Sequence, residues 1–134
     1  MSKTFAMIKP DIVGKVRVGI GGIINHLTVE GFKISEMRMV HMTKEQAEGF
    51  YAEHKGKPFF DNLCDFMTSD STIVMVLERS DAVAHWRKVI GSTNPAEADD
   101  NTIRQSWGTS IDRNAVHGSD SEESAAREIN YFFG

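Results

Sequence analysis

The sequence predicts an α+β fold, a ferredoxin-like βαββαβ sandwich with helices packed on one face of an antiparallel sheet. Strand-like runs alternate along the chain with segments whose apolar residues recur at helical spacing. All five residues of segment 73–77 are apolar, which is typical of a strand buried on both faces. The 134 residues are close to the length of one ~150-residue domain, so we expect residues 1–134 to form a single domain.

The first part of the chain contains two expected strands with a helix between them. Residues 4–9 form the first strand, which Pro10 ends, and residues 32–42 have the length of the second. Between these strands, four apolar residues follow the i, i+3, i+4, i+7 pattern of a helix that Gly31 caps: Ile20, Ile23, Ile24 and Leu27.

Two further helices are expected before the buried strand. Thr43 and Gln46 have the spacing of a capping box, and the stripe that follows them is Ala47, Phe50, Tyr51 and His54. Pro58 begins the second of these helices, whose residues in register are Phe60, Leu63, Cys64 and Met67.

The remaining elements are a helix, a long polar segment, a short strand and a last helix. Ser80 is placed to cap the first of these helices. Segment 91–109 is polar and irregular, and loops of that length are usually functional or disordered. Residues 115–117 can form a short strand, and Asp120 with Glu123 supplies a charged cap for the last helix.

Composition excludes several classes of protein. Hydrophobic residues make up 40% and charged residues 25%, which argues against disorder, and the net charge of −4 disfavours non-specific nucleic-acid binding. Cys64 is the single cysteine, which rules out an intrachain disulfide and a multi-cysteine zinc site. No apolar run approaches the ~20 residues that span a bilayer, and the N-terminus lacks the apolar region of a secretory signal. We therefore expect a cytoplasmic protein with no membrane or nucleic-acid partner.

The glycine-rich motifs that bind phosphate through the backbone are absent. Segment 19–22 (GIGG) fails the dinucleotide fingerprint because residue 24 is Ile, and Gly56-Lys57 is followed by Pro58 rather than Ser or Thr. If the protein handles phosphate, it does so with side chains.

Segment 114–124 is the candidate reactive site. It places His117 at the end of a probable strand beside Gly118, whose missing side chain frees one flank of the ring. A neutral imidazole is nucleophilic near neutral pH, and Glu128 could hydrogen-bond one ring nitrogen and so fix which nitrogen attacks. The residues alone leave open a turn histidine beside a well-capped helix.

The same segment resembles the active-site signature of nucleoside diphosphate kinases, in the form Asn114-x-x-His117-Gly118-Ser119-Asp120. Other blocks resemble this family in the family's order: 4–11 (TFAMIKPD), 31–34 (GFKI), Tyr51-x-x-His54, 58–60 (PFF), 66–69 (FMTS), 91–96 (GSTNPA), 102–104 (TIR) and Glu128. The resemblance implies a ping-pong enzyme that moves the γ-phosphate of a nucleoside triphosphate, typically ATP, onto a nucleoside diphosphate through a phosphohistidine.

The resemblance assigns catalytic roles to five residues. His117 would attack through Nδ1, while Glu128 accepts a hydrogen bond from the other ring nitrogen and Ser119 hydrogen-bonds near both. Lys9 would lie beside the transferred phosphate and the ribose 3′-OH, where phosphoryl transfer needs positive charge. Tyr51 would lie near the γ-phosphate, although its position on an apolar helical stripe makes core packing a competing explanation.

The resemblance also assigns the nucleotide-binding residues. Arg87, Thr93 and Arg104 would contact the α- and β-phosphates. Phe59 would stack on the base and Leu63 would line the same slot. Because stacking accepts any base, little discrimination among bases is expected.

Metal and partners follow from the same resemblance. Asn114 would contact the ribose, and Mg²⁺ would arrive on the nucleotide phosphates, with Asp120 reaching it through water. The implied partners are nucleoside di- and triphosphates and further copies of the chain, as a tetramer or hexamer built from dimers. A nucleotide-binding oligomer with a regulatory role separate from turnover is the alternative function.

Two segments depart from the family pattern. Segment 12–22 is longer and richer in glycine than the family turn, and Asp99-Asp100-Asn101 stands where many relatives carry a Pro-Gly pair. Both departures bear on assembly rather than on the chemistry.

Overall fold

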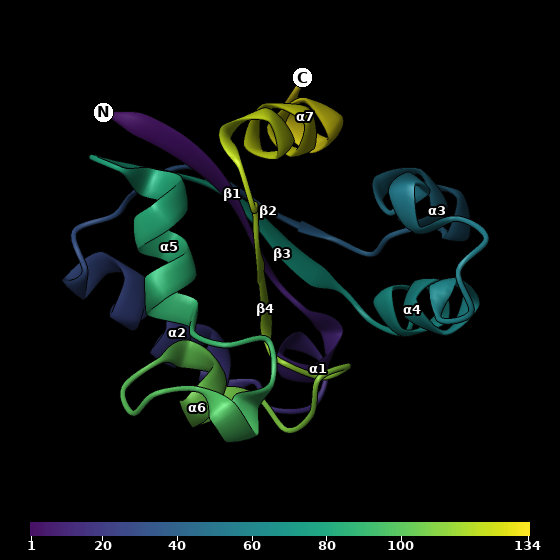
Figure 1. The fold of residues 1–134 in the computed structure, drawn as a ribbon, viewed down its shortest axis with the longest axis horizontal. Helices are drawn as coiled ribbons and strands as arrows, with labels where there is room; N and C mark the ends of the chain where they lie inside the picture. The colour runs from purple at the N-terminus through teal and green to yellow at the C-terminus, as the bar shows by residue number, and fades with distance from the viewer.

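The computed structural model describes residues 1–134, and its elements follow the predicted order (Figure 1). The strands are β1 (Ser2–Ile8), β2 (Lys33–Val40), β3 (Thr72–Arg79) and β4 (Val116–Gly118). The helices are α1 (Pro10–Val13), α2 (Val18–Val29), α3 (Lys44–Phe50), α4 (Phe60–Met67), α5 (Ala82–Ile90), α6 (Ile103–Trp107) and α7 (Glu122–Phe133), with short 3₁₀ helices at Ala52–His54 and Pro95–Glu97. None of the helices combines the length and the hydropathy needed to cross a membrane.

The four strands form one antiparallel sheet in the order β2-β3-β1-β4, which confirms the α+β, ferredoxin-like prediction. β1 lies between β3 and β4, and its register places Met7 opposite His117. Lys9 follows β1 directly, and its backbone N–H donates to the carbonyl of Ala115 at 2.9 Å. The first and last strands therefore bring Lys9 and the His117 segment to the same part of the molecule.

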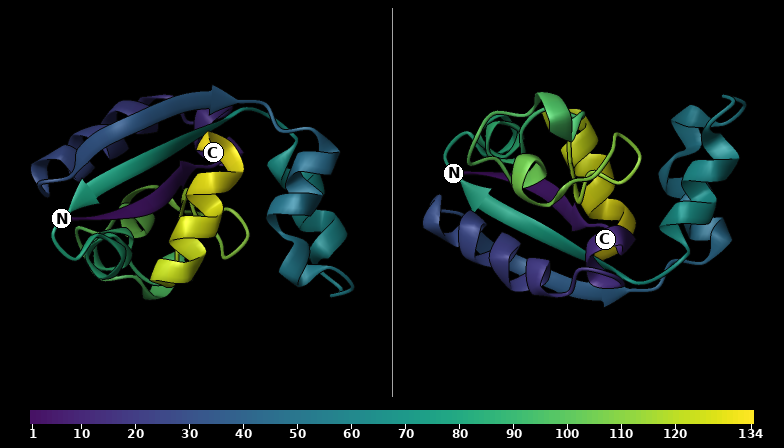
Figure 2. Two further views of the ribbon diagram at one scale, coloured as in Figure 1. Left: turned by 90° about the horizontal axis from the view of Figure 1, so that it is seen from above. Right: turned by 90° about the horizontal axis from the view of Figure 1, so that it is seen from below.

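Apolar side chains cover both faces of the sheet, so the expectation of helices on one face is wrong. Along β1, Ala6 and Ile8 belong to a buried cluster that includes residues of α1, α2, α5 and α6. Phe5 and Met7 point to the other face and join a cluster with α3, α4 and α7. The two-residue period of a strand produces this division. Figure 2 shows α3 and α4 as a pair at one end of the molecule, set apart from the other helices.

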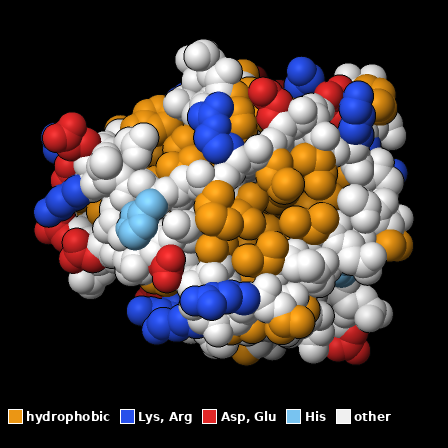
Figure 3. Space-filling view, turned by 180° about the vertical axis from the view of Figure 1, so that it is seen from behind, with side chains coloured by type: hydrophobic (Ala, Val, Ile, Leu, Met, Phe, Trp, Pro, Cys, Tyr) orange, Lys and Arg blue, Asp and Glu red, His pale blue; other side chains and the backbone are white.

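β2 forms one edge of the sheet and pairs with β3 alone. Its Met37 and Met39 side chains are 54% and 59% exposed. Figure 3 views the molecule from behind and shows an apolar surface, and Figure 2 places β2 and α2 on that side. Apolar groups and unpaired backbone groups therefore lie close together on this side.

The helix caps match the sequence patterns at some ends and not at others. Thr43 and Gln46 form the capping box that opens α3, as predicted. The prediction that Ser80 caps α5 is wrong, because the N–H of Ala82 donates to the hydroxyl of Ser2 at 2.8 Å instead. Ser2 is distant in sequence and becomes available only when β1 pairs with β3.

The N-terminus of α7 is capped by Ser121, which differs from the predicted cap. Asp120 with Glu123 is the predicted cap, but Ser121 occupies the N-cap and shares reciprocal hydrogen bonds with Ser124. At the end of α2, Gly31 adopts φ +89° as its predicted role requires.

Segment 91–109 contains a 3₁₀ helix and α6, so the expectation of an irregular loop is wrong. Trp107, the last residue of α6, packs against Gly19 and Gly22 of α2. A Cβ atom at Gly22 would lie 2.5 Å from Cζ2 of Trp107, closer than carbon atoms approach without displacement. Glycines in segment 12–22 therefore admit the indole that joins α6 to α2.

Candidate active site

His117 lies in the middle of β4 and is held at both its backbone and its ring. The indole Nε1 of Trp86 donates to the His117 carbonyl at 3.3 Å. The ring lies edge-on to Phe50 and Phe5, with centroid distances of 5.6 and 6.0 Å. Its side chain remains 22% exposed, so the fixed ring is accessible to solvent.

Glu128 from α7 fixes the tautomer of His117. Its Oε1 atom lies 2.9 Å from His117 Nε2 and also accepts from Ser119 Oγ at 2.8 Å. Its Oε2 atom lies 3.5 Å from Nη2 of Arg127. Because a carboxylate only accepts, Nε2 carries the proton and Nδ1 keeps its lone pair. In the neutral ring, this geometry leaves Nδ1 as the nitrogen with a free lone pair.

Gly118 has a different use from the one expected. A Cβ there would lie 2.6 Å from Cδ1 and 2.9 Å from Nε1 of Trp86. The space that the glycine leaves free is therefore occupied by the indole, and the expectation that it frees a flank of the His117 ring is wrong. The glycine lets Trp86 approach and hold the strand that carries the histidine.

Tyr51 follows α3 and is almost fully buried. It packs edge-on to Phe50 at 4.9 Å, as a core residue would. Its hydroxyl nevertheless has no hydrogen-bond partner. Burial, and then the negative charge of Glu128, raises the pKa of Tyr51 well above its usual value. The phenol is therefore neutral, and its hydroxyl is free to donate a hydrogen bond.

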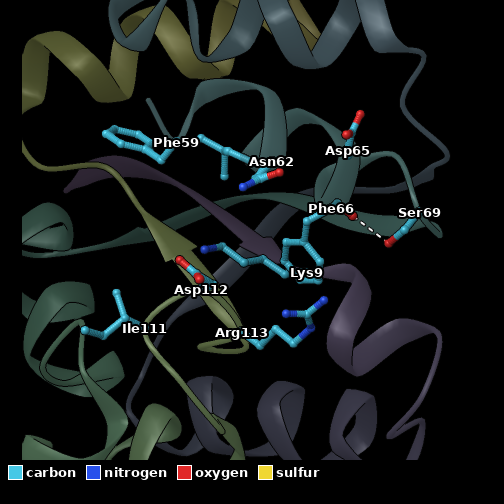
Figure 4. Close-up of a pocket in the computed structure, with 10 residues that line it drawn as sticks. Lys9, Phe59, Asn62, Asp65, Phe66, Ser69, Ile111, Asp112 and Arg113 are labelled. Atoms are coloured by element: carbon cyan, nitrogen blue, oxygen red, sulfur yellow. Dashed lines mark hydrogen bonds between the residues drawn. The ribbon is translucent and has the colours of Figure 1, made fainter. Parts of the chain in front are cut away.

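Lys9, Phe59 and Leu63 line a cavity of about 790 Å³ (Figure 4). The Lys9 ammonium donates to Oδ1 of Asn114 at 2.9 Å. Burial and, second, the charge of Arg104 lower the pKa of Lys9 to about 8, against the opposing charges of Asp11 and Asp112. Lys9 is therefore protonated at neutral pH, with little margin.

The cavity has a second wall that sequence reasoning missed. Ile111, Asp112 and Arg113 line it from the segment after α6, and Figure 4 shows Ile111 across the cavity from Phe59. The two side chains are 56% and 47% exposed, respectively. The available sequence signal for this wall was Ile111, an apolar residue in a polar segment three positions before Asn114. A flat aromatic ring facing an aliphatic side chain can hold a planar group.

Arg87, Thr93 and Arg104 line a second cavity of about 480 Å³, together with Lys88. The cavity collects three cations from two helices, α5 and α6. Two carboxylates, Glu97 and Asp99, also line the cavity, so cations outnumber carboxylates by one and the site favours an anion such as a phosphate group.

Arg104 lies on α6 rather than in a loop, which corrects the sequence prediction. Its Nη1 and Nη2 atoms each donate at 3.0 Å, to the carbonyls of Gly91 and Val116. Its Nε atom is buried without a partner. Burial, and then the charge of Arg87, lowers the pKa of Arg104 to about 10. Arg104 therefore remains charged while bracing the residue before His117.

Asn114 joins the two cavities. Its Oδ1 accepts from Lys9 in the first, and its Nδ2 donates to the carbonyl of Thr93 in the second at 3.1 Å. His117 and Glu128 line neither cavity, so the structure brings the predicted residues together in three groups, of which Asn114 links two.

Asp120 is suited to a metal ion that arrives with its own ligands. A hydrogen bond from Ser124, then Ser121 and the charge of Arg87, hold the pKa of Asp120 below its usual value. Its carboxylate is exposed and ionised. No cluster of three or more His, Cys, Asp or Glu residues could hold a metal ion. A single ionised carboxylate at Asp120 fits Mg²⁺ that is carried on phosphates, because Mg²⁺ keeps several of its water ligands.

A sequence model described as nucleoside diphosphate kinase matches residues 2–134. The chain belongs to the nucleoside diphosphate kinase family. The nucleoside diphosphate kinases of Geotalea daltonii and Chlamydia abortus are 53% and 55% identical to it over 99% of the chain, which covers 96% and 93% of those proteins. As a member of the family, it transfers the γ-phosphate of a nucleoside triphosphate to a nucleoside diphosphate.

Solved structures of nucleoside diphosphate kinases have the same fold. The enzyme of Aquifex aeolicus matches with a TM-score of 0.95 and 38% identity, over 99% of this chain and 95% of that one. The enzyme of Halobacterium salinarum, solved in complex with CDP, matches with a TM-score of 0.92 and 40% identity, over 98% and 87% of the two chains.

Proposed function

We propose that the transfer runs through a phosphohistidine on His117. Nδ1 attacks the γ-phosphorus, a nitrogen–phosphorus bond forms, and the bond to the β-phosphate oxygen breaks to release the nucleoside diphosphate. In the second half, a terminal phosphate oxygen of another diphosphate attacks the same phosphorus and regenerates the imidazole. The hydrogen bond between Nε2 and Glu128 carries this proposal, because it leaves Nδ1 as the free nitrogen.

The two cavities support a division of the nucleotide between them. Phe59 and Leu63, with Ile111 opposite, would hold the base, and Lys9 and Asn114 would contact the ribose and the transferred phosphate. Stacking on Phe59 accepts purines and pyrimidines alike, because every base has a π-face.

The cations of the second cavity are suited to the α- and β-phosphates. Arg87 and Thr93 are exposed there and free to contact a ligand. Arg104 would contribute its unpartnered Nε–H and its charge, since its other two nitrogens already donate to carbonyls. Tyr51 is suited to donate its free hydroxyl near the reacting phosphate.

Mg²⁺ would be held by the nucleotide phosphates, with the ionised Asp120 reaching its water shell. The bound ion would neutralise charge on the phosphates during transfer. The H. salinarum enzyme carries CDP, which supports binding of a nucleoside diphosphate by this related chain.

The exposed edge strand supports assembly into dimers that build a tetramer or hexamer. Met37 and Met39 are exposed on this strand and would be covered if β2 met a second copy of the chain. We place the protein in the cytoplasm because its substrates are abundant there. The net charge of −4 disfavours binding to nucleic acid, so we expect no nucleic-acid partner.

Labelling with γ-labelled ATP in the absence of acceptor tests the proposal. The wild type should retain label that is acid-labile and alkali-resistant, and His117→Ala should retain none. His41→Ala is the matched control, because His41 is an exposed histidine whose ring is hydrogen-bonded to the Thr68 carbonyl. Label that persists in His117→Ala would refute the phosphohistidine, and nucleotide binding without label would favour the regulatory alternative.

Acceptor choice tests the proposed base slot separately. With dTTP as donor, so that each transfer gives a product distinct from the reactants, kcat/KM should be similar for ADP, GDP, CDP and UDP. Strong selectivity for one base would contradict binding by stacking alone.

A further inference from the structure

The first cavity is bounded by two walls that come from different parts of the chain. One wall is α4 with its flanks, which carries Phe59 at its start and Phe66 near its end. The other is segment 109–113, which carries Ile111 and Arg113. Phe59 and Ile111 face each other but are about half exposed, so the core does not fix the space between them.

Arg113 connects the two walls. Its guanidinium carbon lies 5.0 Å from the centroid of the Phe66 ring, and Figure 4 shows the two side chains facing each other in the cavity. The Arg113 carbonyl accepts from the N–H groups of Thr109 and Ser110 at 2.9 and 3.3 Å. The Arg113 N–H donates to Ser110 Oγ at 3.1 Å. These bonds close segment 109–113 into a turn, which the stacked guanidinium attaches to α4.

We propose that the cation–π contact between Arg113 and Phe66 is a clasp that sets the width of the base slot between Phe59 and Ile111. The inference rests on the proposed function, because it takes this cavity as the nucleotide site. Arg113 and Phe66 are positioning residues here, since they act on the base slot through segment 109–113.

The clasp acts on nucleotide affinity and not on the transfer step. Without it, nucleotide binding must first order segment 109–113, and this cost is the same for every base. A cation–π contact at an exposed site corresponds to about a two- to five-fold change in an equilibrium constant. KM should therefore rise by that factor for ADP and CDP alike, while kcat at saturation is retained.

Steady-state kinetics on Arg113→Gln, Phe66→Leu and the double variant test the clasp. The two single changes should raise KM by the same factor, and the double variant should be no worse than either, because both break one contact. Arg79→Gln is the matched control. Arg79 makes the same kind of contact with Phe32, at 5.6 Å, away from the cavity. Its KM should equal that of the wild type.

Amide hydrogen exchange gives a readout that does not depend on turnover. The N–H groups of Thr109 and Ser110 should exchange faster in Arg113→Gln than in the wild type, and saturating ADP should remove the difference. Arg113 is exposed, so this variant keeps the fold even if Phe66→Leu weakens it.

Three outcomes would overturn the clasp. They are an unchanged KM, additive effects of the two changes, or a higher KM in Arg113→Gln alone, which would indicate direct contact with the ligand. In each case the wild type would still form phosphohistidine. Loss of that label in the wild type would instead remove the proposed function.

Discussion

Replacement of Gly22 by alanine isolates the packing between α2 and α6. A Cβ at Gly22 would lie 2.5 Å from Cζ2 and 3.2 Å from Cε2 of Trp107. Gly21 is the matched control, because a Cβ there has no neighbour within 4 Å. Both residues lie inside α2, so the gain in helix propensity is shared and only the contact with the indole differs.

The expected free energies follow from these distances. Alanine in place of glycine inside a helix stabilises by about 0.8–1 kcal/mol, which Gly21→Ala should show in full. Overpacking costs about 1–3 kcal/mol, so Gly22→Ala should lie between no change and about 2 kcal/mol of destabilisation. The two variants should therefore differ by about 1–3 kcal/mol, or roughly 4 °C in Tm per kcal/mol for a chain of this size.

Urea unfolding measures this difference, and light scattering on both variants separates effects on folding from effects on assembly. Trp107→Leu completes a double-mutant cycle, because the shorter leucine side chain removes the clash with the methyl group that Gly22→Ala introduces. In that background Gly22→Ala should cost less than in the wild type. Equal stability of Gly21→Ala and Gly22→Ala, or an equal cost of Gly22→Ala in both backgrounds, would refute the reasoning.

Three further predictions concern the proposed site and the sheet edge. Since the pKa of Lys9 is lowered to about 8, kcat/KM should fall as pH rises through 8 and Lys9 loses its proton. Lys9→Arg should move this decrease to higher pH. A decrease at the same pH in Lys9→Arg would contradict the assignment of the decrease to Lys9. Glu128→Gln removes a charge-assisted hydrogen bond and should slow labelling of His117 roughly 10- to 100-fold in a quenched time course, with KM little changed. An unchanged labelling rate would contradict the role of Glu128 in orienting the His117 ring. Lysine at both Met37 and Met39 should lower the mass measured by light scattering while leaving the unfolding midpoint of the monomer unchanged, and an unchanged mass would exclude assembly through β2.

Strong local patterns predicted the elements well. The apolar spacing around Ile23 identified α2, the Thr43 capping box opened α3, and segment 73–77 lies within the buried strand β3. In each case the signal and the structure it predicts lie within a few residues of each other. Propensity and side-chain period act over that range.

The errors occur where a long-range contact replaces a local one. The cap of α5 comes from Ser2 across the sheet, and no pattern near Ser80 reveals it. Arg104 lies on a helix of five residues, which is too short to show a periodic pattern. Its bonds to Gly91 and Val116 depend on how α5, α6 and β4 pack together.

Some contacts of the candidate site were predictable from the sequence and others were not. The spacing from His117 to Glu128 suggested a hydrogen bond, and the structure contains it. The linking role of Asn114, with Lys9 on one side and Thr93 on the other, required three distant segments to be placed in space. The roles assigned to these residues remain predictions that the labelling and pH experiments address.

The molecule combines a fixed histidine with a half-exposed pair of apolar side chains, and the proposed transfer between nucleotides of any base requires both. His117 is held by strand pairing, by Trp86 and by Glu128, all of which are buried or nearly so. Phe59 and Ile111, in contrast, are half exposed and lie outside both core clusters. Attack on phosphorus needs an accurately oriented nitrogen whatever the base, whereas stacking between Phe59 and Ile111 tolerates any base, because every base has a π-face. Changes around His117 should therefore act on kcat, and changes at the slot should act on KM.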